Sequence, residues 1–280
     1  MRLRGVRGSR NIEDRRSRGR VGRRAGGIGG VGLIVLLVIG YFTGMDVTPF
    51  LQGGGAPVSQ QSRPVSEADQ RAAEFTSRVL ATTEEVWGQI FPQQLGRTYD
   101  PPTLVLYSGV TQSPCGGASG ATGPFYCPAD KKAYLDTSFF VTMERQLGAG
   151  GDFAAAYVVA HEVAHYVQDQ LGILGEVDRR RRLASQTEGN LLTVRLELQA
   201  DCLSGVWARA VGSLMERGDL QEALNAARMI GDDHLARQAG RVPQPHTFTH
   251  GTSDQRERWF ARGYDTGRMQ ECDTFSTNRL

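Results

Sequence analysis

The chain has 280 residues, of which 22% are charged and 40% hydrophobic, and it contains 35 Gly and 11 Pro. This apolar content excludes a wholly disordered chain, and the lack of a three-residue Gly period or sustained heptads excludes collagen and coiled coil. The net charge of +2 is unevenly distributed, because ten Arg against Glu13 and Asp14 give residues 1–30 a charge of +8 and leave −6 for the other 250 residues. A protein that binds nucleic acid along its whole length is basic throughout, whereas most of this chain is acidic, so we expect no nucleic-acid partner.

The first predicted element is a transmembrane helix over residues 25–45. These 21 residues between Arg24 and Asp46 carry no charge, and at about 1.5 Å per residue they can cross a hydrocarbon core of roughly 30 Å. The Arg-rich residues 1–24 predict a cytoplasmic tail, a single-pass protein of the cell membrane and export of everything after Asp46. The alternative is a cleaved signal peptide, against which stand the long basic region and the lack of an Ala-x-Ala cleavage site.

After the predicted span, residues 46–65 have the composition of a flexible linker, and residues 66–280 are long enough for one domain with a core. The four cysteines all follow the span, and an even number in an oxidising compartment predicts two disulfides. Of the three possible pairings we favour Cys115 with Cys127, which closes a short Gly- and Pro-rich loop, and Cys202 with Cys272, which ties the carboxyl-terminal tail to a helix.

Periodicity predicts a mostly helical α+β domain. Ser66 and Asp69 resemble a capping box at the start of the first helix, and residues 108–130 read as a Gly- and Pro-rich loop. In chain order we expect a helix over 67–91, strands over 103–107 and 133–140, and helices from Asp152 to about Gln170, over 185–212, over 219–230 and over 253–263.

The helix that begins near Asp152 contains His161, Glu162 and His165 in the pattern His-Glu-x-x-His. Two His four residues apart lie on one helix face and can bind one metal ion, while the Glu between them can reach a water bound to that ion. The alternative is chance occurrence of the pattern. The apolar residues before it favour a buried helix, in which unpaired imidazoles and a carboxylate would be costly.

A catalytic zinc ion needs a third protein ligand and an open position. A third His six residues after His165 is excluded, because Leu171 stands there, and the other His lie in or near loops. Glu197 and Asp201 are four residues apart on the second long helix, so one carboxylate can bind the metal while the other accepts a hydrogen bond from a ligand His. A solvated acidic face is the alternative, and the apolar neighbours of this pair argue against it.

Six sequence blocks in one order resemble the family of bacterial membrane-anchored putative neutral zinc metallopeptidases. The blocks are GPFYCPAD (123–130), YLDTSFF (134–140), GDFAAAYVVAHEVAHYVQ (151–168), RLELQADCLSGVWA (195–208), IGDDHLARQAG (230–240) and THGTSDQRERWFARG (249–263). The resemblance implies a zincin-like fold that binds one Zn²⁺ per chain. It implies that His161, His165 and Glu197 are the ligands and Glu162 the base.

The expected function is therefore extracytoplasmic hydrolysis of peptide bonds in a peptide or protein substrate by a membrane-anchored zinc endopeptidase. We further expect His250 to donate a hydrogen bond to the oxyanion, with Arg256 holding local structure. The alternative is that His250 caps the last helix or bonds to a backbone carbonyl. Strand 133–140 is either the edge that pairs with substrate or an internal strand. The alternative function is a non-catalytic, membrane-tethered binding or assembly module that contains zinc.

Overall fold

The structure is a computed structural model of the chain, and it describes residues 1–16, 65–119, 123–146 and 148–280. The predicted span over 25–45 and all of the predicted linker except Val65 lie outside these ranges. Within the described ranges, no helix is both long enough and apolar enough to cross a membrane.

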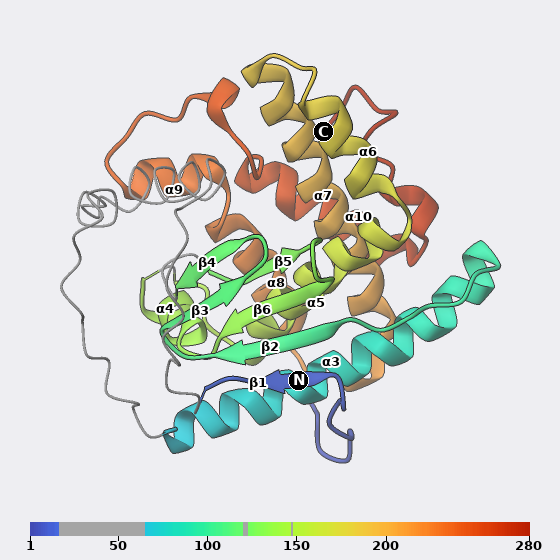
Figure 1. Cartoon of the computed structure of the whole chain (residues 1–280), viewed down its shortest axis with the longest axis vertical. Coiled ribbons are helices and arrows are strands. Elements are labelled where there is room, and N and C mark those ends of the chain that lie inside the picture. Colours follow the sequence, from blue (N-terminus) through green and yellow to red (C-terminus); the bar gives the residue numbers. More distant parts are fainter. Residues whose placement is uncertain (17–64, 120–122, 147) are drawn as a thin grey trace.

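The described elements are a long helix and short strands in the first half of the domain and further helices in the second, which is a mostly helical α+β arrangement as expected (Figure 1). The strands are β1 (Ile12–Asp14), β2 (Thr103–Tyr107), β3 (Val110–Ser113), β4 (Gly116–Ser119), β5 (Phe125–Cys127) and β6 (Lys132–Asp136). The α-helices are α3 (Glu67–Ile90), α4 (Phe139–Gln146), α5 (Asp152–Gln170), α6 (Ile173–Arg181), α7 (Gln186–Ala210), α8 (Asp219–Met229), α9 (Asp232–Gln238) and α10 (Ser253–Thr266).

The larger sheet has the strand order β1-β2-β6-β5, with β1, β2 and β6 parallel and β5 antiparallel to β6. In its register Leu106 lies opposite Leu135, and Phe125 lies opposite Tyr134. The strand predicted over 133–140 is β6; it ends at Asp136 and α4 begins at Phe139. Because β6 is paired on both sides, it is the internal strand of the two alternatives and not the edge that could pair with substrate.

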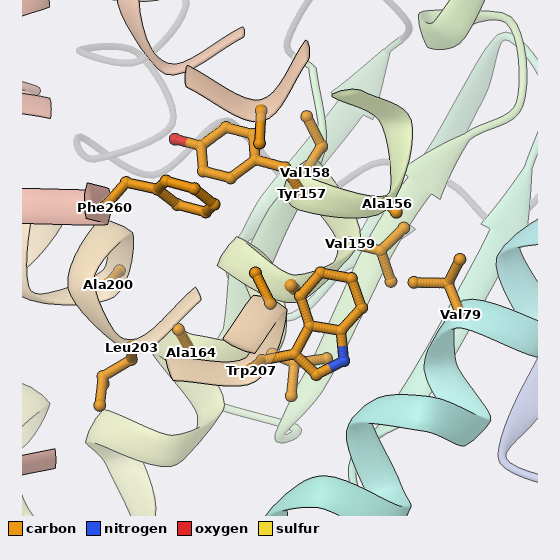
Figure 2. Packing of buried hydrophobic residues seen from close by; sticks show 14 of the residues in the cluster. Val79, Ala156, Tyr157, Val158, Val159, Ala164, Ala200, Leu203, Trp207 and Phe260 are labelled. Atoms are coloured by element: carbon orange, nitrogen blue, oxygen red, sulfur yellow. The ribbon is translucent and has the colours of Figure 1, made fainter. Parts of the chain in front are cut away.

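The helices pack on the sheet and on one another around a core that includes Trp207 of α7 (Figure 2). Phe153 of α5 stacks on Trp207, and Tyr157 of α5 meets Phe260 of α10 edge to face with ring centroids 5.4 Å apart. Helices α7 and α10 approach closely because one of the residues at their crossing is Gly263, where an added Cβ would lie 1.8 Å from the Cys202 carbonyl oxygen. This close approach brings α10 next to the predicted ligand helix.

The predicted long helices and the first predicted strand are present, and Ser66 and Asp69 form the predicted capping box. The predicted disulfides are also present, joining Cys115 to Cys127 and Cys202 to Cys272, and no cysteine is free. The region expected to be a loop over 108–130 instead contains β3, β4 and β5, and helices α4, α6 and α9 were not expected. These elements have three to nine residues each, which is too short for periodicity to identify them.

The described part of the amino-terminal segment differs from the expected separate tail, because it packs against the domain. Strand β1 pairs with β2 at one edge of the sheet, beside α3 (Figure 1). The Met1 ammonium group lies 2.8 Å from Asp152 and 3.2 Å from Asp219, and Lys132 of β6 lies 2.7 Å from Glu13 of β1. Residues 1–16 thus complete a domain that the sequence pattern placed at residues 66–280.

Candidate metal centre

Helix α5 holds the predicted histidines in the interior of the domain. Nearly every residue from Phe153 to Gln168 is buried, because Ala, Val and aromatic side chains occupy all faces of this helix. His161 and His165 are one turn apart, and their ring centroids are 4.8 Å apart. The helix α7, which packs on α5, supplies Glu197 to the same place.

His161, His165 and Glu197 each offer one ligand atom to a group in which all these atoms lie within 4.8 Å of one another. Nε2 of His161 is 3.1 Å from one carboxylate oxygen of Glu197, and Nε2 of His165 is 3.4 Å from the other. Two imidazole nitrogens and one carboxylate are a donor set typical of catalytic zinc. Among the described residues, the group has no fourth His, Cys, Asp or Glu, so these residues fit a zinc ion with an open position.

Asp201 lies behind His161, as expected, and outside the ligand group. Its Oδ1 is 3.0 Å from Nδ1 of His161, in contact but without the alignment of a full hydrogen bond. The same carboxylate accepts two hydrogen bonds of 2.9 Å from Arg256 and one of 2.5 Å from the Tyr157 hydroxyl. Burial works to raise the pKa of Asp201, but the Arg256 guanidinium and His161 together outweigh it and hold the pKa below its usual value. Arg256 therefore keeps a charged carboxylate against the back of His161.

Glu162 is 8% exposed and does not belong to the ligand group. Burial raises its pKa above that of an ordinary Glu, and the nearby His165 and His161 oppose this shift only in part. A raised pKa brings a carboxylate closer to the range in which it takes up and releases protons at neutral pH. Glu162 is thus suited to proton transfer.

His250 lies in the turn before α10, with its side chain 49% exposed and its Nδ1 3.2 Å from Oδ1 of Asp232. The other Asp232 oxygen accepts hydrogen bonds of 2.7, 2.6 and 3.0 Å from three successive backbone N–H groups, those of residues 249–251. This turn packs on α7 beside Glu197, since a Cβ on Gly251 would lie 3.2 Å from the Leu198 side chain. Burial lowers the pKa of His250, but the bond to Asp232 and the charge of Glu197 give it a net rise.

Asp232 is a candidate site residue that the sequence reasoning missed. It lies 18 residues before His250 along the chain, and no helical or strand spacing connects the two. The block IGDDHLARQAG contained it, but the pattern gave no reason to pair it with a histidine. The structure shows that its carboxylate fixes both the turn and the imidazole.

A second carboxylate group formed by Asp152, Asp219 and Glu222 is close enough to hold a metal ion. A cation already occupies this group, because the Met1 ammonium lies within 3.2 Å of Asp152 and Asp219 and compensates part of their negative charge. Glu222 accepts a hydrogen bond of 3.1 Å from the backbone N–H of Phe153. These carboxylates therefore bind the amino-terminal ammonium group and a backbone N–H at the start of α5.

Comparison with known proteins gives relatives along the whole chain. The profile of the family described as putative neutral zinc metallopeptidase matches residues 1–275. The chain is 51% identical to the uncharacterized protein YpfJ of Escherichia coli K12, over 98% of this chain and 99% of YpfJ. It is 42% identical to the uncharacterized protein Mb2605 of Mycobacterium bovis, over 72% of this chain and 71% of Mb2605. No solved structure matches.

Proposed function

Because the chain belongs to the family of putative neutral zinc metallopeptidases, we propose that it is a zinc-dependent endopeptidase. The observation that carries the proposal is the grouping of three zinc donors with a separate buried carboxylate. His161, His165 and Glu197 provide the donors, and Glu162 lies next to them in α5 without joining the group. A site that only holds zinc as structure has no use for this extra carboxylate and normally has four protein ligands.

When bound, zinc supplies a Lewis acid that polarises a peptide carbonyl and lowers the pKa of a water molecule. In our proposal Glu162 takes a proton from the attacking water and delivers it to the leaving amine. His250 donates a hydrogen bond to the oxygen on which negative charge develops. Asp232 holds Nδ1 of His250, which leaves Nε2 as the nitrogen that faces substrate.

An extended peptide substrate needs a sheet edge, and β5 provides one where the internal strand β6 does not. Strand β5 ends the described sheet on the side opposite β1. It lies against the active-site helix, because the Tyr126 hydroxyl donates a hydrogen bond of 2.9 Å to Asp169 of α5. Addition of the substrate backbone to β5 is therefore the arrangement that we propose.

We propose an extracytoplasmic location for the domain. Two disulfides within one domain support it, because such bonds persist in oxidising compartments. Anchoring through residues 25–45 and a cytoplasmic amino terminus remain predictions from the charge pattern. The docking of residues 1–16 on the domain opposes the second of these.

The test is zinc content and peptide cleavage by the purified full-length protein, with Glu162→Gln and Glu197→Ala as variants. The wild type should contain about one zinc per chain and lose cleavage with a chelator. Glu162→Gln should keep its zinc while turnover falls by about 10² or more, and Glu197→Ala should lose most of the zinc. Bound zinc with no cleavage of any peptide library by the wild type would instead support a non-catalytic zinc module.

A further inference from the structure

A second hydrogen-bond network leads from His165 into the interior, separate from the one that Asp201 and Arg256 form behind His161. Oε1 of Gln168 lies 2.8 Å from Nδ1 of His165. Gln168 is 0% exposed, so this side chain bonds only to protein groups. Its amide nitrogen donates hydrogen bonds of 2.7 Å to the Leu196 carbonyl and 3.0 Å to Oε1 of Gln199.

This hydrogen-bond network determines which nitrogen of His165 carries the proton. The Leu196 carbonyl can only accept a hydrogen bond, so it fixes the amide nitrogen of Gln168 on its side and leaves Oε1 facing His165. An amide oxygen also only accepts, so Nδ1 of His165 must be the donor. The lone pair of His165 is therefore on Nε2, the atom that lies 3.4 Å from Glu197.

A disulfide holds the end of this hydrogen-bond network that is farther from His165. Nε2 of Gln199 donates a hydrogen bond of 3.1 Å to the carbonyl of Cys272, and both residues are buried. Cys272 is bonded to Cys202, three residues after Gln199 on α7. The side-chain amides of Gln168 and Gln199, which connect His165 to the Cys272 carbonyl, thus have defined donor and acceptor atoms.

We propose that Gln168 is a positioning residue that sets His165 in the tautomer and orientation that bind zinc, and that Gln199 holds Gln168 in place. The inference rests on zinc being the bound metal and is independent of whether the protein cleaves peptides. His161 has a charged carboxylate behind it, whereas His165 has a neutral amide. The two imidazoles thus have different acceptors beside Nδ1, a carboxylate for His161 and an amide oxygen for His165. Groups that orient metal ligands typically change metal affinity by about 10- to 100-fold when they are removed.

The experiment measures the zinc dissociation constant of the full-length protein by competition with a chromophoric chelator. Gln168→Met keeps the side-chain length and removes the acceptor, and should weaken zinc binding by about 10- to 100-fold. Gln199→Met should weaken it in the same direction by less. The matched control is Gln170→Met on the same helix, because Gln170 bonds to the Asp100 carbonyl and the Tyr166 hydroxyl, and its zinc affinity should not change.

A spectroscopic measurement keeps the proposal testable even if Gln168→Met fails to fold. The ¹⁵N shifts of zinc-loaded wild-type protein with labelled His should show a protonated Nδ1 and a metal-bound Nε2 for His165. Wild-type zinc affinity in folded Gln168→Met, or a His165 that binds zinc through Nδ1, would overturn the proposal. Neither result would bear on peptide cleavage, so failure here is distinguishable from failure of the proposed function.

Discussion

Replacing Arg256 with Met tests whether the centre depends on the charge behind His161. Arg256 is 2% exposed, and its guanidinium donates two hydrogen bonds to Asp201 and one of 3.2 Å to the Tyr157 hydroxyl. Met is of comparable length and fills much of the same space without the charge. The variant therefore leaves the buried Asp201 carboxylate without its guanidinium partner, and His161 remains as the neighbouring group that can carry a positive charge.

The magnitude follows from the burial of both partners. Removing one member of a buried ion pair costs about 3–5 kcal/mol, because the other charge stays out of water. For a folded unit of this size that corresponds to a fall in Tm of about 6–20 °C. Without Arg256, the pKa of Asp201 rises relative to wild type, because burial raises it and His161 is left to oppose the rise. A falling pH therefore protonates Asp201 earlier in the variant and relieves the cost. The stability difference between wild type and variant should thus be largest at neutral pH and shrink in acid.

The assay is calorimetric unfolding of metal-free full-length protein at several pH values. The double variant R256M/D201N removes both charges and should recover much of the lost stability. The matched control is Arg262→Met on the same helix, because Arg262 is half exposed and its ion pair with Glu271 contributes at most about 1 kcal/mol. A loss below about 1 kcal/mol in Arg256→Met, or a double variant no better than the single, would refute the reasoning.

Two further predictions follow from other contacts. Asp232→Asn removes the charge that raises the pKa of His250, so His250 should lose its proton at a lower pH than in wild type. The alkaline limb of the kcat/KM profile should therefore shift to lower pH. A limb at the wild-type pH would contradict a role for His250 as a charged donor. Gly263→Ala places a Cβ 1.8 Å from the Cys202 carbonyl and should lower the free energy of unfolding by about 1–3 kcal/mol. Gly212→Ala, whose Cβ meets nothing within 4 Å, should change it little.

The grouping of His161, His165 and Glu197 could be predicted because its signal is local. His161 and His165 are one turn apart on a helix whose apolar composition marks it as buried, and Glu197 and Asp201 repeat the spacing on a second helix. Helix α7 lies close to its predicted range of 185–212, and in the structure a capping box at Ser185 begins it. The spacing did not decide which of the two carboxylates is the ligand. The packing of α7 on α5 places Glu197 in the ligand group and Asp201 behind His161.

The partners of these residues could not be predicted, because they depend on contacts between distant segments. Asp232 meets His250 through a turn, and Gln199 meets the Cys272 carbonyl through a disulfide that closes 70 residues. Strand β1 is a still harder case. Its sequence, Ile-Glu-Asp, has two charged residues out of three and only becomes a strand by pairing with β2.

The docking of β1 leads to a prediction about topology, because a strand cannot pair with a sheet on the other side of a bilayer. Glu13 of β1 lies 2.7 Å from Lys132, and hydrogen bonds from Arg15 and Lys132 lower the pKa of Glu13 to about 2. A water-soluble carbodiimide joins such a pair directly, and Lys131 and Lys132 are the only lysines in the chain. We expect native membranes treated in this way to yield a Glu13–Lys132 cross-linked peptide.

Lys132→Arg keeps the charge but cannot form the isopeptide bond, so it should abolish the product, whereas Lys131→Arg should not. The cross-link would place residues 1–16 and the zinc domain on one side of the membrane, and a single crossing by residues 25–45 would then be excluded. The charge pattern predicts the opposite, since ten Arg before residue 25 favour a cytoplasmic end. Absence of the cross-link in membranes, together with its presence in detergent-purified protein, would show that the bilayer separates two segments that otherwise pair. That result would refute our expectation and leave the topology predicted from charge in place.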